Sequence, residues 1–395
     1  MNILRNFFSE YFFFWTNLLL KRPEAKLFLC GCLLCFVQSC NHEDSSNSAG
    51  KTDFVESTEL KNYETLVDLE ENKLATPVII RHGSDSTFFV YDVRQQQVLK
   101  MDKKGTIINK IGRTGRGPGE YLFVNNMFVR EQHLYIIDIV QFMIHKYDME
   151  GNFVSSFNFG EIAGQPTIPP PGIGLVTANE IDNQPYVNLQ GDIILSNVNV
   201  GDKSEHIFQI IDWEKKKQLS ELGEVPEGSS FVLDNQKLRN EATDGKVPSF
   251  YKPNSFPVQD RDNPNEYFVI YSSLSQIAKY AANGGKLWEK NINTTETNSI
   301  RTRFFDAMDR MSNSPDIRDR VGLEYYSSGF SNNEGDLYLV VNTSPVMIHQ
   351  YNNAGKLLHK YKFSSKNITP VLDIDFANSR ILAASEKGEI RAYPF

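Results

Sequence analysis

Short runs of alternating apolar and polar residues, separated by turn residues, recur along most of this chain. In four places a strand ends in a large apolar residue, glycine follows four positions later, and a new alternating strand begins. Glycine suits the positive φ of a hairpin turn, and a nearby Asp or Asn can hydrogen-bond to the turn backbone. The apolar residues are Met101, Tyr147, Tyr280 and Tyr351, and the glycines are Gly105, Gly151, Gly284 and Gly355.

Another strand precedes each of these hairpins and ends nine residues before the apolar position, at Asp92, Asp138, Tyr271 and Asn342. A fifth copy, Ile211 to Lys215, lacks the glycine, and a sixth, Val371 to Pro394, is one strand short. The spacing between apolar positions, 46 residues from Met101 to Tyr147, is typical of propeller blades. The alternating segment Glu64 to Leu69 would complete the sixth unit. We therefore expect an all-β fold, a single six-bladed β-propeller over residues 61–395, with its N-terminal strand closing the last blade.

Two insertions interrupt this pattern. Residues 165–174 are rich in proline, which cannot donate to a β-ladder, and are expected to form an extended loop. The segment Ile300 to Met311 has helical periodicity and predicts one short helix. Packing of its apolar face on the rim of the propeller is favoured over binding of a partner.

The first 40 residues have the features of an export signal. Lys21, Arg22 and Lys26 precede an apolar run, Leu27 to Val37, that is too short to span a bilayer. The tetrapeptide that ends at Cys40 resembles the bacterial lipobox, which implies that Cys40 is lipidated. Residues 1–20 are unusual for a signal, and an over-long start of translation is one explanation. Residues 41–60 are expected to form a flexible tether, because a Ser/Asn/Gly-rich stretch follows Cys40.

Charge and cysteine content narrow the range of functions. The chain has a formal net charge of −8, which argues against nucleic-acid binding. All four cysteines precede residue 41, so the exported body can contain neither a disulfide nor a thiolate metal site. The histidines include no pair at metal-ligand spacing, and we expect neither a metal nor another cofactor.

The stretch from Ile111 to Tyr121 resembles the signature of Bacteroides-type six-bladed propeller lipoproteins, which in turn resemble NHL-repeat and TolB-like propellers. The resemblance implies the propeller fold and an envelope location, and no particular activity. As a structural connector the loop would pair Arg113 or Arg116 with Glu120, and this reading is favoured over a ligand-binding loop. The signature residues are Gly112, Arg113, Gly115, Arg116, Gly117, Pro118, Gly119 and Glu120.

Residues on the innermost strands of a propeller can meet in its central channel, where ligands bind. The candidate ligand residues are Arg81, His82, Asn126, Arg130, Tyr326, Asp373 and Asp375. We expect an exported, monomeric binding module that only its lipid anchor holds in the cell envelope. The expected location is the outer membrane, on either its surface or its periplasmic side. Its partner would be an envelope protein, a peptide or a glycan.

The alternative is a metal-dependent lactonase or lyase-type hydrolase, with His82, Asn126, Asp373 and Asp375 as ligands of a hard divalent metal. No sequence pattern selects that arrangement, so an enzymatic role is the less favoured reading. No catalytic residue is predicted.

Overall fold

The computed structural model describes residues 55–68, 74, 76–83, 86–163, 182–197, 205–313 and 322–395. The predicted signal and Cys40, and the proline-rich insertion 165–174, lie outside these residues. Residues 55–395 form one compact unit. Among the described residues, no helix is both long and apolar enough to cross a membrane.

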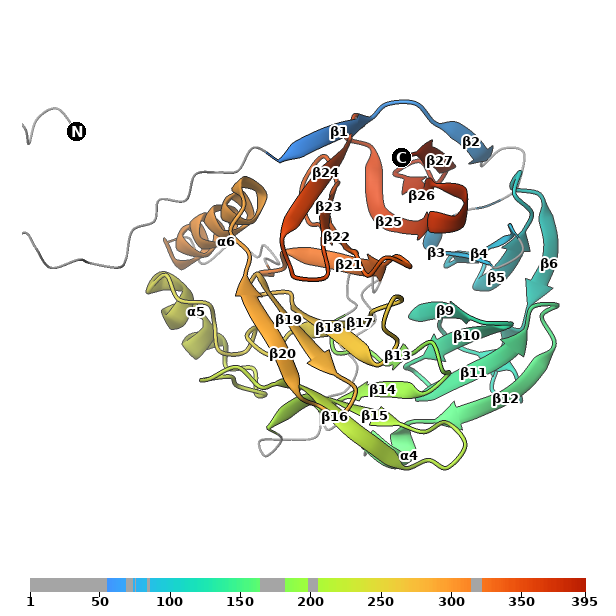
Figure 1. Ribbon diagram of the computed structural model, residues 1–395, viewed down its shortest axis with the longest axis horizontal. Helices are drawn as coiled ribbons and strands as arrows, with labels where there is room; N and C mark the ends of the chain where they lie inside the picture. Colours follow the sequence, from blue (N-terminus) through green and yellow to red (C-terminus); the bar gives the residue numbers. More distant parts are fainter. Residues whose placement is uncertain are drawn as a thin grey trace, which may run out of the picture. The chain divides into compact units, whose positions relative to one another are not determined.

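Six antiparallel sheets are arranged around a central axis (Figure 1), so the predicted six-bladed propeller is confirmed. In each of the first five blades, four consecutive strands run from the inner to the outer side along the chain, and in the sixth blade three do so. The first blade consists of β3 (Pro77–His82), β4 (Phe88–Asp92), β5 (Gln97–Met101) and β6 (Ile107–Ile111). The second consists of β9 (Asn126–Arg130), β10 (His133–Asp138), β11 (Met143–Asp148) and β12 (Phe153–Asn158). The third consists of β13 (Tyr186–Val187), β14 (Ile193–Ser196), β15 (His206–Ile211) and β16 (Gln218–Glu224).

The fourth blade consists of β17 (Ser255–Gln259), β18 (Glu266–Tyr271), β19 (Gln276–Ala281) and β20 (Lys286–Asn291). The fifth contains β21 (Tyr326–Ser331), β22 (Leu337–Val341), β23 (Met347–Tyr351) and β24 (Leu357–Phe363). The sixth blade is built from both ends of the described chain. β25 (Ile368–Asp375), β26 (Arg380–Ser385) and β27 (Ile390–Pro394) are joined by β2 (Glu64–Val67), which pairs antiparallel with β27. The predicted closure of the ring by the strand at residue 64 is confirmed.

A second N-terminal strand, β1 (Glu56–Leu60), was not expected. It pairs in parallel with β24 and adds a fifth strand to the fifth blade. The flexible tether predicted over residues 41–60 is therefore wrong for residues 56–60. The side-chain pattern of β1 explains the error, because only Leu60 is buried and the strand shows no apolar alternation.

The hairpin turns have the predicted chemistry. The Asp102 carboxylate accepts hydrogen bonds from the backbone N–H groups of Lys104 and Thr106, both at 2.9 Å, and Gly105 has φ +86°. The copy that lacks glycine, in the third blade, places Lys216 in the left-handed region instead, at φ 53°. Its turn is held by Asp212, whose carboxylate accepts the N–H of Lys215 at 2.7 Å.

The apolar residues of neighbouring blades form six buried clusters. Leu66 and Val67 of β2 share one cluster with Leu99 and Met101 of the first blade and Leu382 of the sixth. The closing strand therefore packs against the first blade while it pairs with the last.

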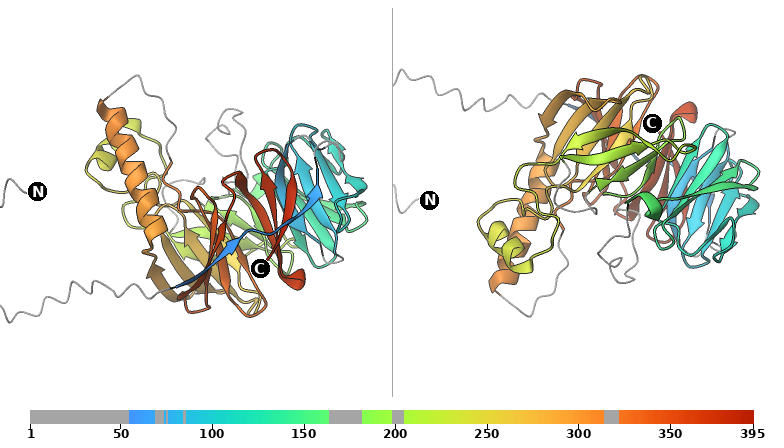
Figure 2. Two further views of the ribbon diagram at one scale, coloured as in Figure 1. Left: turned by 90° about the horizontal axis from the view of Figure 1, so that it is seen from above. Right: turned by 90° about the horizontal axis from the view of Figure 1, so that it is seen from below.

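Helix α6 (Thr295–Asn313) confirms the predicted helical insertion and extends it at both ends. Its apolar residues Ile300, Phe304 and Met308 are buried in the cluster shared by the fourth and fifth blades, as the rim-packing reading requires. A second helix, α5 (Asn235–Thr243), was not expected, and it lies beside α6 at one side of the ring (Figure 2). A single turn, α4 (Gly160–Ala163), follows the second blade.

We expect Gly105→Ala to destabilise the ring at the closing strand. A Cβ at residue 105 would lie 2.0 Å from the carbonyl oxygen of Leu66 in β2. Gly245 is the matched control, because it also has a positive φ, +72°, and a Cβ there would meet nothing within 4 Å. Gly245→Ala should cost only the left-handed strain, about 1 kcal/mol of unfolding free energy in urea titrations, and Gly105→Ala roughly 3 kcal/mol or more. Equal losses would contradict close packing of β2 on this turn.

Candidate functional site

The innermost strands of all six blades enclose a central channel. β3, β9, β13, β17, β21 and β25, with the turns that follow them, supply its walls, and the space between these walls amounts to about 1070 Å³ including the open mouths. The central channel is where the blade pattern predicted that the candidate ligand residues would meet.

Among the described residues, three arginines and one aspartate line the channel. Arg81, Arg130, Arg261 and Asp373 together carry a net charge of +2, although the whole chain is at −8. Burial lowers the pKa of the Arg81 guanidinium, and the nearby Arg130 lowers it further while Asp373 opposes the shift. The positive charges are therefore close enough to repel one another in a partly desolvated space.

Two of the arginines are fixed by the protein. The Arg81 guanidinium donates to the carbonyl oxygens of Met127 (2.8 Å) and Ile80 (2.7 Å) and to Oδ1 of Asn126 (2.7 Å). Arg130 donates to the carbonyl oxygens of Val187 (2.8 Å) and Val129 (3.0 Å). Its guanidinium carbon also lies 5.0 Å and 5.3 Å from the ring centroids of Phe128 and Tyr186, within the range of cation–π contacts. Both side chains link neighbouring blades.

His82 and Asp373 form a pair across the junction of the first and last blades. Oδ2 of Asp373 lies 2.6 Å from both the backbone nitrogen and Nδ1 of His82. Burial raises the pKa of the Asp373 carboxyl, but His82 and Arg81 outweigh burial and leave that pKa below its usual value. The carboxylate is therefore the state that this environment stabilises.

Arg261 differs from the other two arginines. It follows β17 in the turn to β18, and its side chain lines the channel. Burial lowers the pKa of its guanidinium, and Arg130 adds to the shift. Among the described residues, its guanidinium has no hydrogen-bond or ion-pair partner, whereas its backbone N–H donates to Oγ of Ser331 at 3.3 Å.

The structure brings most of the predicted site residues together. Arg81, His82, Asn126, Arg130 and Asp373 all line the channel. The prediction was wrong for the remaining two residues, neither of which reaches it.

Tyr326 is fully buried in the apolar cluster between the fourth and fifth blades, because its position on β21 faces the core. Asp375 ends β25 and caps the short helix η2 (Phe376–Asn378), where its Oδ2 accepts from Nε of Arg380 at 2.9 Å.

The sequence reasoning missed several lining residues, including Gln184, Tyr186, Gln259 and Arg261. β13 spans only two residues, too few for a visible alternation. β17 contains a proline and its five residues are all buried, so it shows no alternation of apolar and polar positions. The one available signal for Arg261 was its place between the end of this strand and the next apolar run.

The signature loop is a connector between the first two blades, as the favoured reading held. β7 (Arg113–Thr114) pairs with β8 (Glu120–Tyr121), and Nε of Arg113 lies 2.6 Å from Oε1 of Glu120. The N–H of Gly117 donates to the same carboxylate at 2.7 Å. No residue of this loop lines the channel.

The residues proposed as metal ligands do not converge. Asp373 is paired with His82, Asn126 with Arg81, and Asp375 with Arg380. In the part of the chain that the structure describes, no group of three or more His, Cys, Asp or Glu residues could hold a metal ion.

Comparisons with known proteins agree with the architecture. Residues 44–162 match a family described as a 6-bladed beta-propeller (DUF5128). A solved structure of a DUF4221-family protein from Bacteroides vulgatus has 10% identity over 81% of this chain and 93% of that chain, with a TM-score of 0.50. A candidate exported protein from Bacteroides fragilis has 13% identity over 85% and 98%, with a TM-score of 0.49. The family match supports the predicted resemblance to six-bladed propellers.

A more distant likeness extends to enzymes. A gluconolactonase from Xanthomonas campestris has 13% identity over 84% of this chain and 88% of that chain, with a TM-score of 0.45. No curated protein matches the sequence. At these identities the solved structures indicate the fold alone.

We expect Asp373→Asn to destabilise the protein by about 2 kcal/mol at pH 7, because it removes a buried carboxylate that pairs with the backbone N–H and the ring of His82. The lowered pKa of Asp373 means that its contribution is present above the unfolded pKa of about 3.9 and is lost as the pH falls through the folded pKa. The measurement is the free energy of unfolding against pH. The exposed Asp262→Asn is the control and should change it little. A loss at pH 7 no larger than that of Asp262→Asn would contradict the pairing.

Proposed function

We propose that this protein is an exported, lipid-anchored binding module of the cell envelope, and that its ligand, or part of it, enters the central channel. The ligand is a small molecule, a peptide or glycan end, or a segment of a partner protein. The observation that carries the proposal is the channel itself, into which six inner strands bring fixed polar groups from distant parts of the sequence, together with a guanidinium that has no partner among the described residues. Pre-positioned polar groups within an otherwise apolar wall are typical of ligand sites.

The enzymatic alternative has less support from the geometry. The carboxylates that a hard metal ion needs are committed to His82 and Arg380, and three arginines would repel a divalent cation. Stoichiometric divalent metal in the purified protein, lost in Asp373→Asn, would contradict the binding-module proposal.

The envelope location rests on the leader. Its basic residues, short apolar run and terminal cysteine are typical of a lipoprotein signal. Acyl chains on Cys40 would hold the propeller at a membrane without a spanning helix. The strand β1 begins at residue 56, so at most 15 residues, from 41 to 55, separate the proposed anchor from the propeller.

Lipidation is tested by labelling the full chain with a fatty acid in a bacterium that processes lipoproteins. Cys40→Ala should abolish incorporation of label and release the protein from membranes, because the thiol that accepts the lipid is gone. Cys35→Ala is the matched control within the same leader and should be labelled like the wild type. Undiminished label in Cys40→Ala would contradict the proposed anchor.

The channel is tested by narrowing it. Ser328 and Val371 line it from different blades, and Ser328→Phe or Val371→Phe should prevent ligand entry. Wild-type and variant proteins are incubated with an extract of the producing cell's envelope, washed and denatured, and the released molecules are identified by mass spectrometry.

We expect the molecules retained by wild type to fall at least about tenfold in either narrowed variant, because each fills the space that the ligand occupies. Leu219→Phe, at an exposed position on β16, is the control and should retain them fully. Retention of the same molecules by both narrowed variants, with unfolding transitions like that of the wild type, would contradict a channel site.

A further inference from the structure

From the channel geometry we infer that the ligand carries a carboxylate, which Arg261 binds through both terminal nitrogens of its guanidinium. This inference rests on the proposed function and names the chemical class of the ligand at the same site. The body of the ligand is apolar and lies against the aromatic and aliphatic part of the wall, which includes Phe128, Phe256, Phe330, Val371 and Phe376.

The three channel arginines differ in how many of their donors are occupied. Arg81 has hydrogen-bond partners for Nε and both terminal nitrogens, and Arg130 for Nε and one terminal nitrogen. Arg261 alone keeps its whole fork free within the described residues. A planar fork of parallel N–H groups matches the two oxygens of a carboxylate, and such bidentate pairs are among the strongest hydrogen bonds in proteins.

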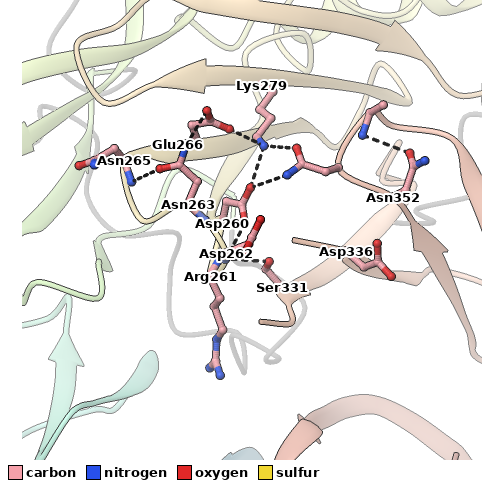
Figure 3. Close-up of polar contacts among 12 residues, drawn as sticks. Asp260, Arg261, Asp262, Asn263, Asn265, Glu266, Lys279, Ser331, Asp336 and Asn352 are labelled. Carbon is pink, nitrogen blue, oxygen red and sulfur yellow. Dashed lines mark hydrogen bonds and ion pairs between the residues drawn. The ribbon is translucent and has the colours of Figure 1, made fainter. Parts of the chain in front are cut away.

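A buried ion network fixes the backbone next to Arg261 (Figure 3). Nζ of Lys279 lies 2.7 Å from Oδ2 of Asp260 and 2.5 Å from Oε2 of Glu266, and it also contacts Oδ1 of Asn353 in the next blade. The side chains of Lys279 and Asp260 are almost completely buried. The residue next to Arg261 in sequence is therefore fixed to two blades.

The same network shapes the turn that carries Arg261. Oδ1 of Asp260 accepts the backbone N–H of Asp262 at 2.9 Å, and Nδ2 of Asn353 donates to Oδ2 of Asp260 at 3.1 Å. Figure 3 shows the Arg261 side chain directed away from this network, on the opposite side from Lys279. A binding group on a fixed backbone loses less entropy when a ligand binds.

The charge of the channel also favours an anion. Its described residues carry a surplus of two positive charges in a protein that is otherwise acidic. Asp373 does not neutralise Arg261 by contact, because its close partner is His82. One carboxylate at Arg261 would halve the surplus, and the neighbouring Arg130 would add to the attraction.

The test is calorimetric titration of the full chain in a neutral detergent. The probes are 3-phenylpropionate, a free acid, and N-acetyl-L-phenylalanine, which imitates the C-terminus of a peptide, each compared with its uncharged amide. Inorganic phosphate is the third anion. We expect both carboxylates to bind at least about tenfold more tightly than their amides and more tightly than phosphate. The acid that binds more tightly indicates the source of the carboxylate.

Arg261→Gln should weaken binding of both acids about 10- to 100-fold and leave the amides unchanged, because it removes the charge and the fork. Arg261→Lys keeps the charge without the fork, so its affinity for the acids should lie between that of the wild type and that of Arg261→Gln. Arg239→Gln, at an exposed position on α5, is the matched control and should bind like the wild type.

Three results would overturn the inference: amides that bind as well as the acids, tighter binding of phosphate than of either acid, or no binding of any acid at about 10 mM. A neutral molecule recovered from the envelope extract through the channel would also overturn it while leaving the proposed function intact. Failure of the narrowed variants to lose their ligand would instead count against the proposed function.

Discussion

Closure of the ring by β2 is the interaction on which the other features depend. A propeller has no edge only if its last blade is completed from the first part of the chain, and here Glu64–Val67 pairs with β27. The same strand buries Leu66 and Val67 between the sixth and first blades. The channel exists because this closure holds β3 and β25 side by side, which brings His82 next to Asp373 although 291 residues separate them in sequence.

Closure also determines where charge can be concentrated. The three arginines of the channel come from the first, second and fourth blades, and each would be solvated if the blades were apart. Arg81 and Arg130 compensate for their desolvation by donating to carbonyl oxygens of the next blade, and in doing so they join blades. Arg261 has no such compensation within the described residues, although the ion network around Lys279 fixes the turn that carries it. Within the described residues, Arg261 is therefore the channel arginine whose whole guanidinium remains available to a ligand.

The fold could be predicted from the sequence because it repeats a local rule. The turn Asp102 to Gly105 and its copies are governed by side-chain hydrogen bonds and a positive φ, and both depend on nearby residues. β1 could not be predicted, because its pairing with β24 depends on a strand some 300 residues away and leaves four of its five side chains exposed. Helix α5 has one buried residue, Ala242, and its only apolar residues are Leu238 and Ala242, too few to mark a helix in the sequence.

Prediction of the site was limited by geometry. Arg81, His82 and Asp373 were found because they are polar positions on strands that the blade repeat identifies as innermost. Tyr186 and Arg261 were missed because β13 is short and β17 is buried throughout. The prediction that Tyr326 and Asp375 line the channel was wrong, because the direction of a side chain at the end of a strand depends on bulges and caps that no sequence pattern reveals. One is buried in the core, and the other caps η2.

A crystal structure of the protein grown with N-acetyl-L-phenylalanine would show whether Arg261 binds a carboxylate in the channel. We expect both carboxylate oxygens about 2.8 Å from the two terminal nitrogens of Arg261, with the phenyl ring against the apolar wall of the channel. A probe bound elsewhere on the propeller, or a channel in which Arg261 turns to pair with Asp373 and excludes the probe, would contradict carboxylate binding at Arg261.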